Sequence, residues 1–195
     1  MALDTAHGHA PSWLRFSESA PESAQTEVIF AATREKVGYV RHQQEVLAHK
    51  PALLAAVSAL GDAVVRDPAG ALSPRERELI ALVVSVENRC EACVFGHAAA
   101  LRQHSGDAEW VGTIEVNYRR AALSARERAL ADYALQVTRA PAEIEPADLD
   151  ALRRTGLRET EILEAAAIAA YFNFSNRLNS ALGIRANGEA YRANR

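Results

Sequence analysis

The chain has 195 residues, which suits one domain with a sizeable buried core. Hydrophobic residues make up 49% of it but aromatic residues only 6%, a balance that favours closely packed helices over a sheet sandwich. The formal net charge of −3, with no basic block, gives no electrostatic reason to expect a nucleic-acid partner.

The first 25 residues are rich in Ser, Ala, Pro and Glu, and we expect them to form an irregular N-terminal arm. Trp13, Leu14 and Phe16 are candidates to anchor this arm against the body or against a neighbouring subunit. We expect no functional role for His7 and His9, which also lie in it. Residues 26–195 are predicted to form a single helical domain.

Three helices are predicted before residue 66, covering about 26–37, 41–49 and 51–65. Gly38 separates the first two, and Pro51 opens the third. Residues 67–70 are typical of a turn.

Two later helix starts carry the same signal. Ser73 and Glu76 have the spacing of a capping box with a proline between them, and Ser124 and Glu127 repeat the box. The surrounding stretches, ALSPRERELI and ALSARERALA, hint at related helices, although one short match is weak evidence for an internal duplication.

The first of these helices should end near Asn88, and a fresh helix should cover about 90–104. A connector holding Trp110 and Tyr118 is expected next. Further helices are predicted over about 124–139, 146–155 and 159–182. No segment alternates in the manner of a strand, so the predicted fold class is all-α.

The only two cysteines, Cys90 and Cys93, lie three residues apart, and His97 follows four residues later. On a helix these three side chains share one face. A thiol pair beside an imidazole has the parts for redox chemistry: a nucleophile, a partner for a disulfide and a proton carrier. From the residues alone Cys90 is the preferred nucleophile, because a helix N-terminus lowers a thiol pKa.

No apolar run reaches the length of a membrane span, and the N-terminus lacks the features of a secretory signal. We therefore expect a cytoplasmic protein without a membrane partner. In a reducing cytosol a Cys-x-x-Cys pair is more often catalytic or metal-binding than a structural staple.

Two other interpretations of the pair stay open. The cysteines are also compatible with two buried, inert side chains. Zinc binding is a second alternative, because His104 continues the face of His97, but four ligands on one straight helix cannot surround a tetrahedral ion.

Glu78, Glu87 and Glu91 are the local carboxylates. By position alone each is a helix-surface residue. A continuous helix would place Glu78 about 18 Å from Cys90. Contact between them requires a chain reversal near Asn88 with a link through His97, or supply from a neighbouring subunit.

The pattern Glu78-x11-Cys90-x2-Cys93-x3-His97, with Ser85 and Asn88 between, resembles the AhpD-like alkylhydroperoxidases of the carboxymuconolactone decarboxylase superfamily. The segment RERELIALVVSVENRCEACVFGHAAAL carries the resemblance. It continues more weakly through AYFNFSNRLNSALGI, which is similar to the closing helix of the uncharacterised peroxidase-related branch. The match covers roughly residues 40–185.

This resemblance implies an all-helical fold, trimers or hexamers, and peroxide reduction without a metal or organic cofactor. It implies that Cys93 is the peroxidatic thiolate and that Cys90 supplies a proton and then resolves the sulfenic acid as a disulfide. His97 and Glu78 would form the proton relay. We follow the resemblance in preferring Cys93 over Cys90 as the nucleophile.

One position departs from the family pattern: well-studied members have a histidine immediately before the second cysteine, where this chain has Ala92. The implied relay is therefore simpler. The decarboxylase branch lacks the cysteine pair, so its retention argues against lactone decarboxylation.

The expected function is thus a thiol peroxidase with a hydroperoxide substrate and a thiol or dithiol electron donor. The alternatives are a thiol–disulfide oxidoreductase or redox sensor, and a metal-binding structural oligomer. Tyr171, Phe172, Asn173 and Phe174 are candidates for a substrate pocket, although aromatics at helical spacing are more often core or interface residues. His42 and His49 are expected at the surface.

Overall fold

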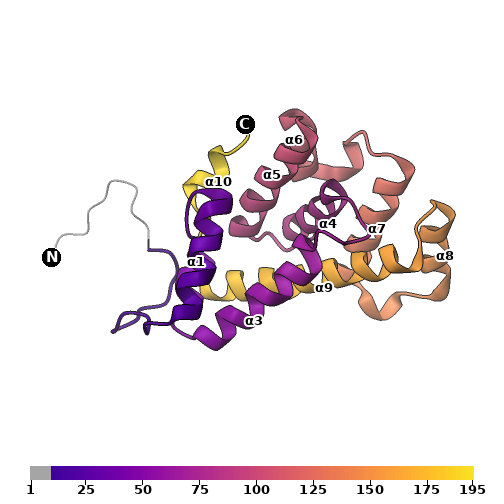
Figure 1. Ribbon diagram of the computed structural model, residues 1–195. Helices are drawn as coiled ribbons and strands as arrows, with labels where there is room; N and C mark the ends of the chain where they lie inside the picture. The colour runs from indigo at the N-terminus through magenta and orange to yellow at the C-terminus, as the bar shows by residue number, and fades with distance from the viewer. Residues whose placement is uncertain (1–9) are drawn as a thin grey trace.

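The computed structural model describes residues 10–195, and every regular element within that range is helical (Figure 1). The predicted all-α fold class is confirmed. The first elements are α1 (Ala24–Val37), α2 (His42–Leu47), α3 (Pro51–Gly61), the π-helical turn η1 (Asp62–Arg66), α4 (Pro74–Glu87) and α5 (Glu91–Ser105). The remaining ones are α6 (Ala108–Asn117), the 3₁₀ turn η2 (Tyr118–Arg120), α7 (Ala125–Arg139), the 3₁₀ turn η3 (Pro141–Glu143), α8 (Pro146–Arg154), α9 (Glu159–Leu182) and α10 (Gly188–Arg192).

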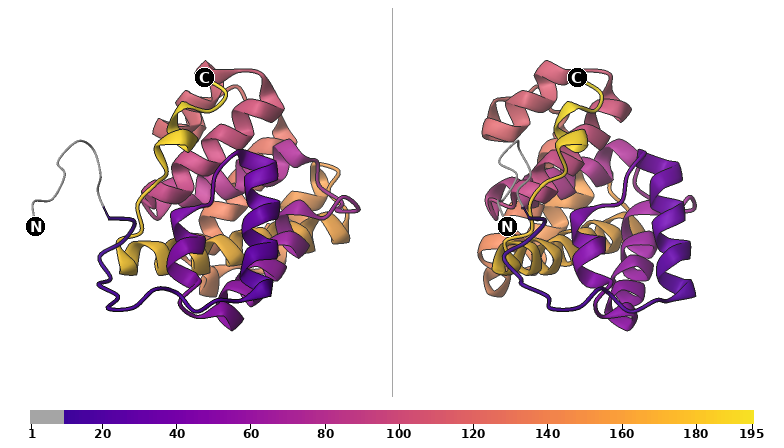
Figure 2. Two further views of the ribbon diagram at one scale, coloured as in Figure 1. Left: turned by 60° about the vertical axis from the view of Figure 1, so that its left-hand side comes forward. Right: turned by 90° about the vertical axis from the view of Figure 1, so that its left-hand side faces the viewer.

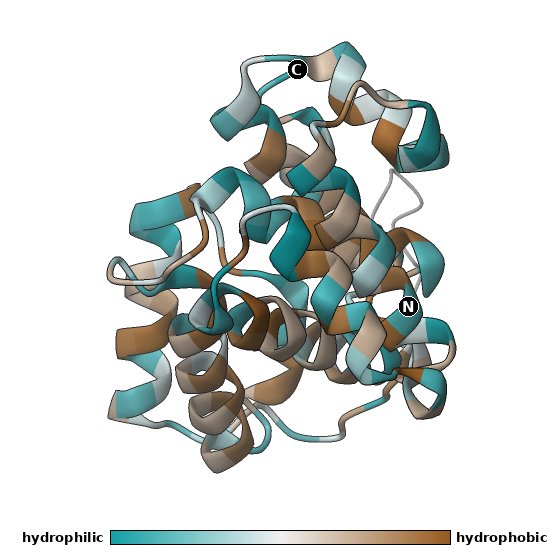
Figure 3. Ribbon diagram, turned by 90° about the vertical axis from the view of Figure 1, so that its right-hand side faces the viewer, coloured by the Kyte–Doolittle hydropathy of each residue, from teal (hydrophilic) through white to brown (hydrophobic). Residues whose placement is uncertain are grey.

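Helix α4 is the centre of the molecule and packs against α5, α7 and α9 (Figure 1). Every residue from Leu79 to Ser85 is buried, as expected for a helix that is covered on all sides. The outer helices bury only one face. Figure 3 shows their bands of hydrophobic and hydrophilic residues alternating along the chain.

A tight reversal joins α4 to α5. Arg89 takes a left-handed conformation with φ of 52°, and the Cys90 N–H donates to the Ser85 carbonyl at 3.0 Å. Cys90 is the N-cap residue of α5. Because the chain turns back here, α5 lies along α4, and residues near the start of α4 come level with the second turn of α5.

Helices α1 to α3 gather on one side of the molecule, seen in indigo and purple in Figure 2. They have a smaller apolar cluster of their own, built on Leu47, Leu54 and Val57. The long α9 joins this layer to the main core, because Tyr171 packs against both clusters.

The N-termini of α4 and α7 are linked by two reciprocal ion pairs. Arg75 Nε lies 2.9 Å from Glu127 Oε1, and Arg126 Nε lies 2.6 Å from Glu76 Oε1. Both predicted capping boxes are formed. The arginine of each stretch thus pairs with the glutamate of the other stretch. This arrangement fits two related helices placed about a local two-fold axis.

Three parts of the chain differ from the sequence-based prediction. The expected connector after α5 contains α6 and η2, the expected third helix ends in a π-helical turn, and α10 was not predicted. Glycine and β-branched residues weaken the helical signal of α6. Burial of Val111 and Ile114 in the core stabilises it instead. Helix α10 is too short to show periodicity.

Residues 10–23 form no helix and run beside the end of α9. The Trp13 N–H donates to the Leu182 carbonyl at 3.0 Å, and the indole covers Gly183. Phe16 stacks on His49 with ring centroids 3.5 Å apart. Trp13 and Phe16 therefore do anchor this segment, whereas His7 and His9 lie outside the described residues.

No helix within residues 10–195 is both long and apolar enough to cross a membrane.

Candidate active site

The two thiols lie side by side at the N-terminus of α5. Cys90 Sγ and Cys93 Sγ are 2.7 Å apart, and both side chains are buried, with 2% and 7% exposed. Cys93 lines a pocket, whereas Cys90 lies behind it. A small reagent that enters the pocket therefore meets Cys93 first.

The electrostatics of the pair separate the two thiols. The hydrogen bond from Cys93 lowers the pKa of Cys90 to about 7, against the opposing effect of burial. The same hydrogen bond, together with burial, raises the pKa of Cys93. The directions of the two shifts favour ionisation of Cys90 over that of Cys93. Cys90 is thus the thiol that ionises more readily, whereas Cys93 is the thiol that lines the pocket.

His97 and Glu78 are in direct contact. His97 Nδ1 lies 2.7 Å from Glu78 Oε2, although the residues come from different helices and are far apart in sequence. Their side chains are only 18% and 14% exposed. The reversal at Arg89 brings them together within one chain. When Nδ1–H donates to the carboxylate, Nε2 is left as a proton acceptor.

Helix α9 supplies polar groups that the sequence analysis missed. Asn179 Nδ2 donates to Cys93 Sγ at 3.2 Å, and Gln43 Nε2 donates to Asn179 Oδ1 at 2.8 Å. Asn176, fully buried, donates to Ser85 Oγ and accepts from Asn88. Polar residues recurring three and four apart on one face of an apolar helix are the signal that could have revealed them.

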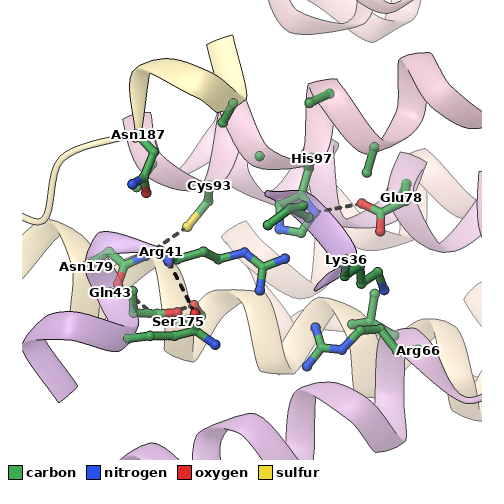
Figure 4. A pocket seen from close by; sticks show the side chains of 18 of the residues that line it. Lys36, Arg41, Gln43, Arg66, Glu78, Cys93, His97, Ser175, Asn179 and Asn187 are labelled. Atoms are coloured by element: carbon green, nitrogen blue, oxygen red, sulfur yellow. Dashed lines mark hydrogen bonds and ion pairs between the residues drawn. The ribbon is translucent and has the colours of Figure 1, made fainter. Parts of the chain in front are cut away.

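The pocket in front of Cys93 has a volume of about 520 Å³, within the range of small-molecule sites. Figure 4 shows Cys93, His97 and Glu78 along one wall, with the cationic side chains of Lys36, Arg41 and Arg66 facing them.

The four residues of α9 that were predicted to line a substrate pocket divide into two groups. Tyr171 and Phe172 line the pocket, and Phe172 makes an edge-on contact with the His97 ring at a centroid distance of 4.3 Å. Asn173 instead bonds to Asn88 and Thr138, and Phe174 is exposed. The pocket prediction is therefore correct for the first two and wrong for Asn173 and Phe174.

The remaining candidates take no part in the thiol contacts. Glu87 pairs with Arg139, and Glu91 is exposed, as expected for solvated charges. His42 and His49, expected at the surface, are partly buried. His104 is exposed at the last turn of α5. Within residues 10–195, no group of three or more His, Cys, Asp or Glu side chains is placed to hold a metal ion.

Two solved structures match nearly the whole chain. An uncharacterised peroxidase-related protein from Silicibacter sp. TM1040 is 35% identical, with 98% of this chain and 100% of that one covered at a TM-score of 0.91. A protein from Ralstonia eutropha JMP134, described as an alkylhydroperoxidase AhpD core and uncharacterised peroxidase-related protein, is 32% identical, with 96% and 98% covered at 0.88.

The debrominase Bmp8, solved as a variant in complex with 2,3,4-tribromopyrrole, has the same fold. It is 19% identical, with 91% of this chain and 95% of that one covered at a TM-score of 0.76. No curated protein matches the chain significantly.

The family model of the carboxymuconolactone decarboxylases matches twice, over residues 51–117 and 110–186. The two matches agree with the reciprocal ion pairs between α4 and α7, which relate the two segments in space. Together they span more than half of the sequence. The chain therefore belongs to the carboxymuconolactone decarboxylase family.

Proposed function

We propose that this protein is a thiol-dependent peroxidase in which Cys93 attacks the hydroperoxide and Cys90 resolves the product. The observation that carries the proposal is the thiol pair, 2.7 Å apart, behind a pocket that also holds the His97–Glu78 contact. The peroxidase-related relatives support the same reaction class.

In the first step the Cys93 proton moves to the Cys90 thiolate, and the resulting Cys93 thiolate attacks the terminal oxygen of the hydroperoxide. An S–O bond forms, the O–O bond breaks, and Cys93 becomes a sulfenic acid. The alkoxide that leaves takes the proton from Cys90. The pocket gives a small substrate access to Cys93, although both thiols are buried.

In the second step the Cys90 thiolate attacks Cys93 Sγ and displaces hydroxide, which becomes water with a proton relayed by His97. The disulfide is the oxidised form of the pair, because the two thiols have given two electrons to the peroxide. An external thiol or dithiol then returns the pair to its reduced form by exchange. Glu78 acts through His97, holding the imidazole in the tautomer whose Nε2 can carry the proton.

Cytoplasmic location and the homo-oligomer implied by the family resemblance remain predictions. Light scattering after gel filtration measures the oligomeric state.

Titration of free thiols before and after one equivalent of an organic hydroperoxide tests the proposal. We expect the wild type to lose two thiols and Cys93→Ser to lose none. Cys90→Ser should lose one and accumulate a sulfenic acid that a dimedone probe captures. Thiols that stay reduced in the wild type would contradict peroxidase activity. Rapid disulfide exchange in that case would favour the oxidoreductase alternative.

A further inference from the structure

Three cationic side chains converge on the pocket that contains Cys93. Arg41, Lys36 and Arg66 all line it, and they come from the segment that runs from the end of α1 to η1. Arg66 pairs with Asp62. Among residues 10–195, no carboxylate lies within ion-pair distance of Arg41 or Lys36. Figure 4 shows the Arg41 side chain extending across the pocket, with Lys36 and Arg66 beyond it.

The charges around this cluster do not balance. Burial and then the nearby Arg66 lower the pKa of Arg41. Burial, followed by Arg66 and Arg41, lowers the pKa of Lys36. Of the negative groups, Asp62 is paired with Arg66, and Glu78 is engaged by His97. While both thiols are protonated, Lys36, Arg41 and Arg66 thus exceed Asp62 and Glu78 by one positive charge, although the chain as a whole has a net charge of −3. This excess suits a monoanion such as a carboxylate.

The rest of the lining is mixed: Gln43, Asn179 and Asn187 are among its polar residues, but one side of the pocket is apolar. Leu47, Leu54 and Val57 form an apolar wall on the side of α2 and α3. On α5 the wall is formed by Ala92 and Gly96. A Cβ atom added to Gly96 would meet nothing within 4 Å, so this helix face leaves free space. A hydrocarbon chain fits this apolar side of the pocket.

We propose that Arg41, assisted by Lys36 and Arg66, binds the carboxylate of an amphipathic organic hydroperoxide whose carbon chain lies against the α2–α3 wall and whose peroxide group reaches Cys93. This assignment rests on the proposed peroxidase function and names its substrate class. Charge-assisted hydrogen bonds from a guanidinium fit a carboxylate well. Hydrogen peroxide and neutral hydroperoxides gain nothing from the cluster.

Binding of an unreactive ligand tests the subsite without any chemistry. Calorimetry with the reduced wild type should detect decanoate, and decan-1-ol should bind about tenfold more weakly. Arg41→Met should weaken the binding of decanoate by about tenfold and leave the binding of decanol unchanged. Arg120→Met is the matched control, because Arg120 is exposed on η2 and does not line the pocket. Equal binding of the acid and the alcohol by the wild type would overturn the subsite.

Gly96→Leu gives a second variant that does not depend on Arg41. It should weaken the binding of both decanoate and decanol, because the leucine side chain fills the free space. If it binds both ligands as the wild type does, the chain does not lie along this wall and the proposal is wrong.

The kinetic test compares a fatty-acid hydroperoxide with its methyl ester. The wild type should be oxidised by the acid about tenfold faster than by the ester at limiting substrate, Arg41→Met should lose that preference, and Arg120→Met should keep it. Undiminished preference in Arg41→Met would refute the role of Arg41. If neither hydroperoxide oxidises Cys93, the peroxidase proposal fails, and the calorimetric comparison still decides whether the pocket binds carboxylates.

Discussion

The carboxylate of Glu78 contacts the imidazole of His97 at 2.7 Å across two helices that run in opposite directions. Since Glu78 reaches no thiol in the described structure, its effect on the chemistry must pass through His97. In the proposed mechanism Glu78 is a positioning residue, so its loss should affect proton transfer more than binding.

Glu78→Gln should slow oxidation of the thiol pair by cumene hydroperoxide by about 100-fold, because a proton carrier of the wrong tautomer or basicity loses general acid–base catalysis. The pH–rate profile should also change shape, since the imidazole no longer faces a carboxylate. Stopped-flow kinetics across pH 5 to 9 measure both effects. Glu87→Gln, on the same helix but paired with Arg139 away from the pocket, should behave as the wild type. An unchanged profile in Glu78→Gln would show that the contact is structural only.

The thiol pair should ionise near neutral pH. The hydrogen bond from Cys93 lowers the pKa of Cys90 to about 7, so thiolate absorbance near 240 nm should rise with pH through a midpoint close to that value. Because the thiolate is the reactive form, the reactivity of the pair is lost as the pH falls below the midpoint. Cys93→Ser replaces the thiol partner and should move the midpoint upward. A single transition above pH 8.5 in the wild type would argue against the coupled pair.

Asn179 should affect the pKa of the thiols although it is far from them in the sequence. Its amide donates to Cys93 Sγ at 3.2 Å, and it lowers the pKa of both cysteines. Asn179→Ala should therefore raise the thiol midpoint by about one pH unit, the equivalent of ~1.4 kcal/mol. Asn179→Asp should raise it further by placing a negative charge beside the thiolate. A midpoint that is the same in all three proteins would exclude this contribution.

Arg126 links three helices at the opposite end of α4. It contacts Glu76 at 2.6 Å and Glu161 at 2.8 Å, and Glu161 is buried. Arg126→Met leaves both carboxylates without this partner and should lower the free energy of unfolding by about 2 kcal/mol in urea at pH 7. Arg120→Met should change it by less than about 0.5 kcal/mol, as an exposed substitution does.

The same ion pair has a pH signature. Hydrogen bonds from Arg126 lower the pKa of Glu161 to about 2 in the folded protein. A depressed folded pKa contributes stability that is complete above the unfolded value near 4.3 and is lost as the pH falls towards 2. The wild type should lose more stability than Arg126→Met between pH 5 and pH 2.5. Parallel losses in the two proteins would place the acid-sensitive group elsewhere.

Local patterns in the sequence were sufficient for the helices and for one part of the site. Capping boxes marked the starts of α4 and α7, and the spacing of Cys90, Cys93 and His97 placed them on one helix face, because both features depend on residues within a turn of each other. Helix α6 was missed because its stability comes from burial of Val111 and Ile114 rather than from propensity.

The tertiary structure alone decided which distant groups meet the thiols. The left-handed turn at Arg89 brings Glu78 to His97, the packing of α9 on α5 brings Asn179 to Cys93, and the layer of α1 to α3 brings Arg41 into the pocket. Local periodicity specifies which face a residue occupies, but which faces meet is set by the burial of whole helices. The sequence by itself thus determined the spacing of the thiol pair and His97 on one helix, and the packing of the helices determined the Glu78–His97 contact, the hydrogen bonds to the thiols and the pocket.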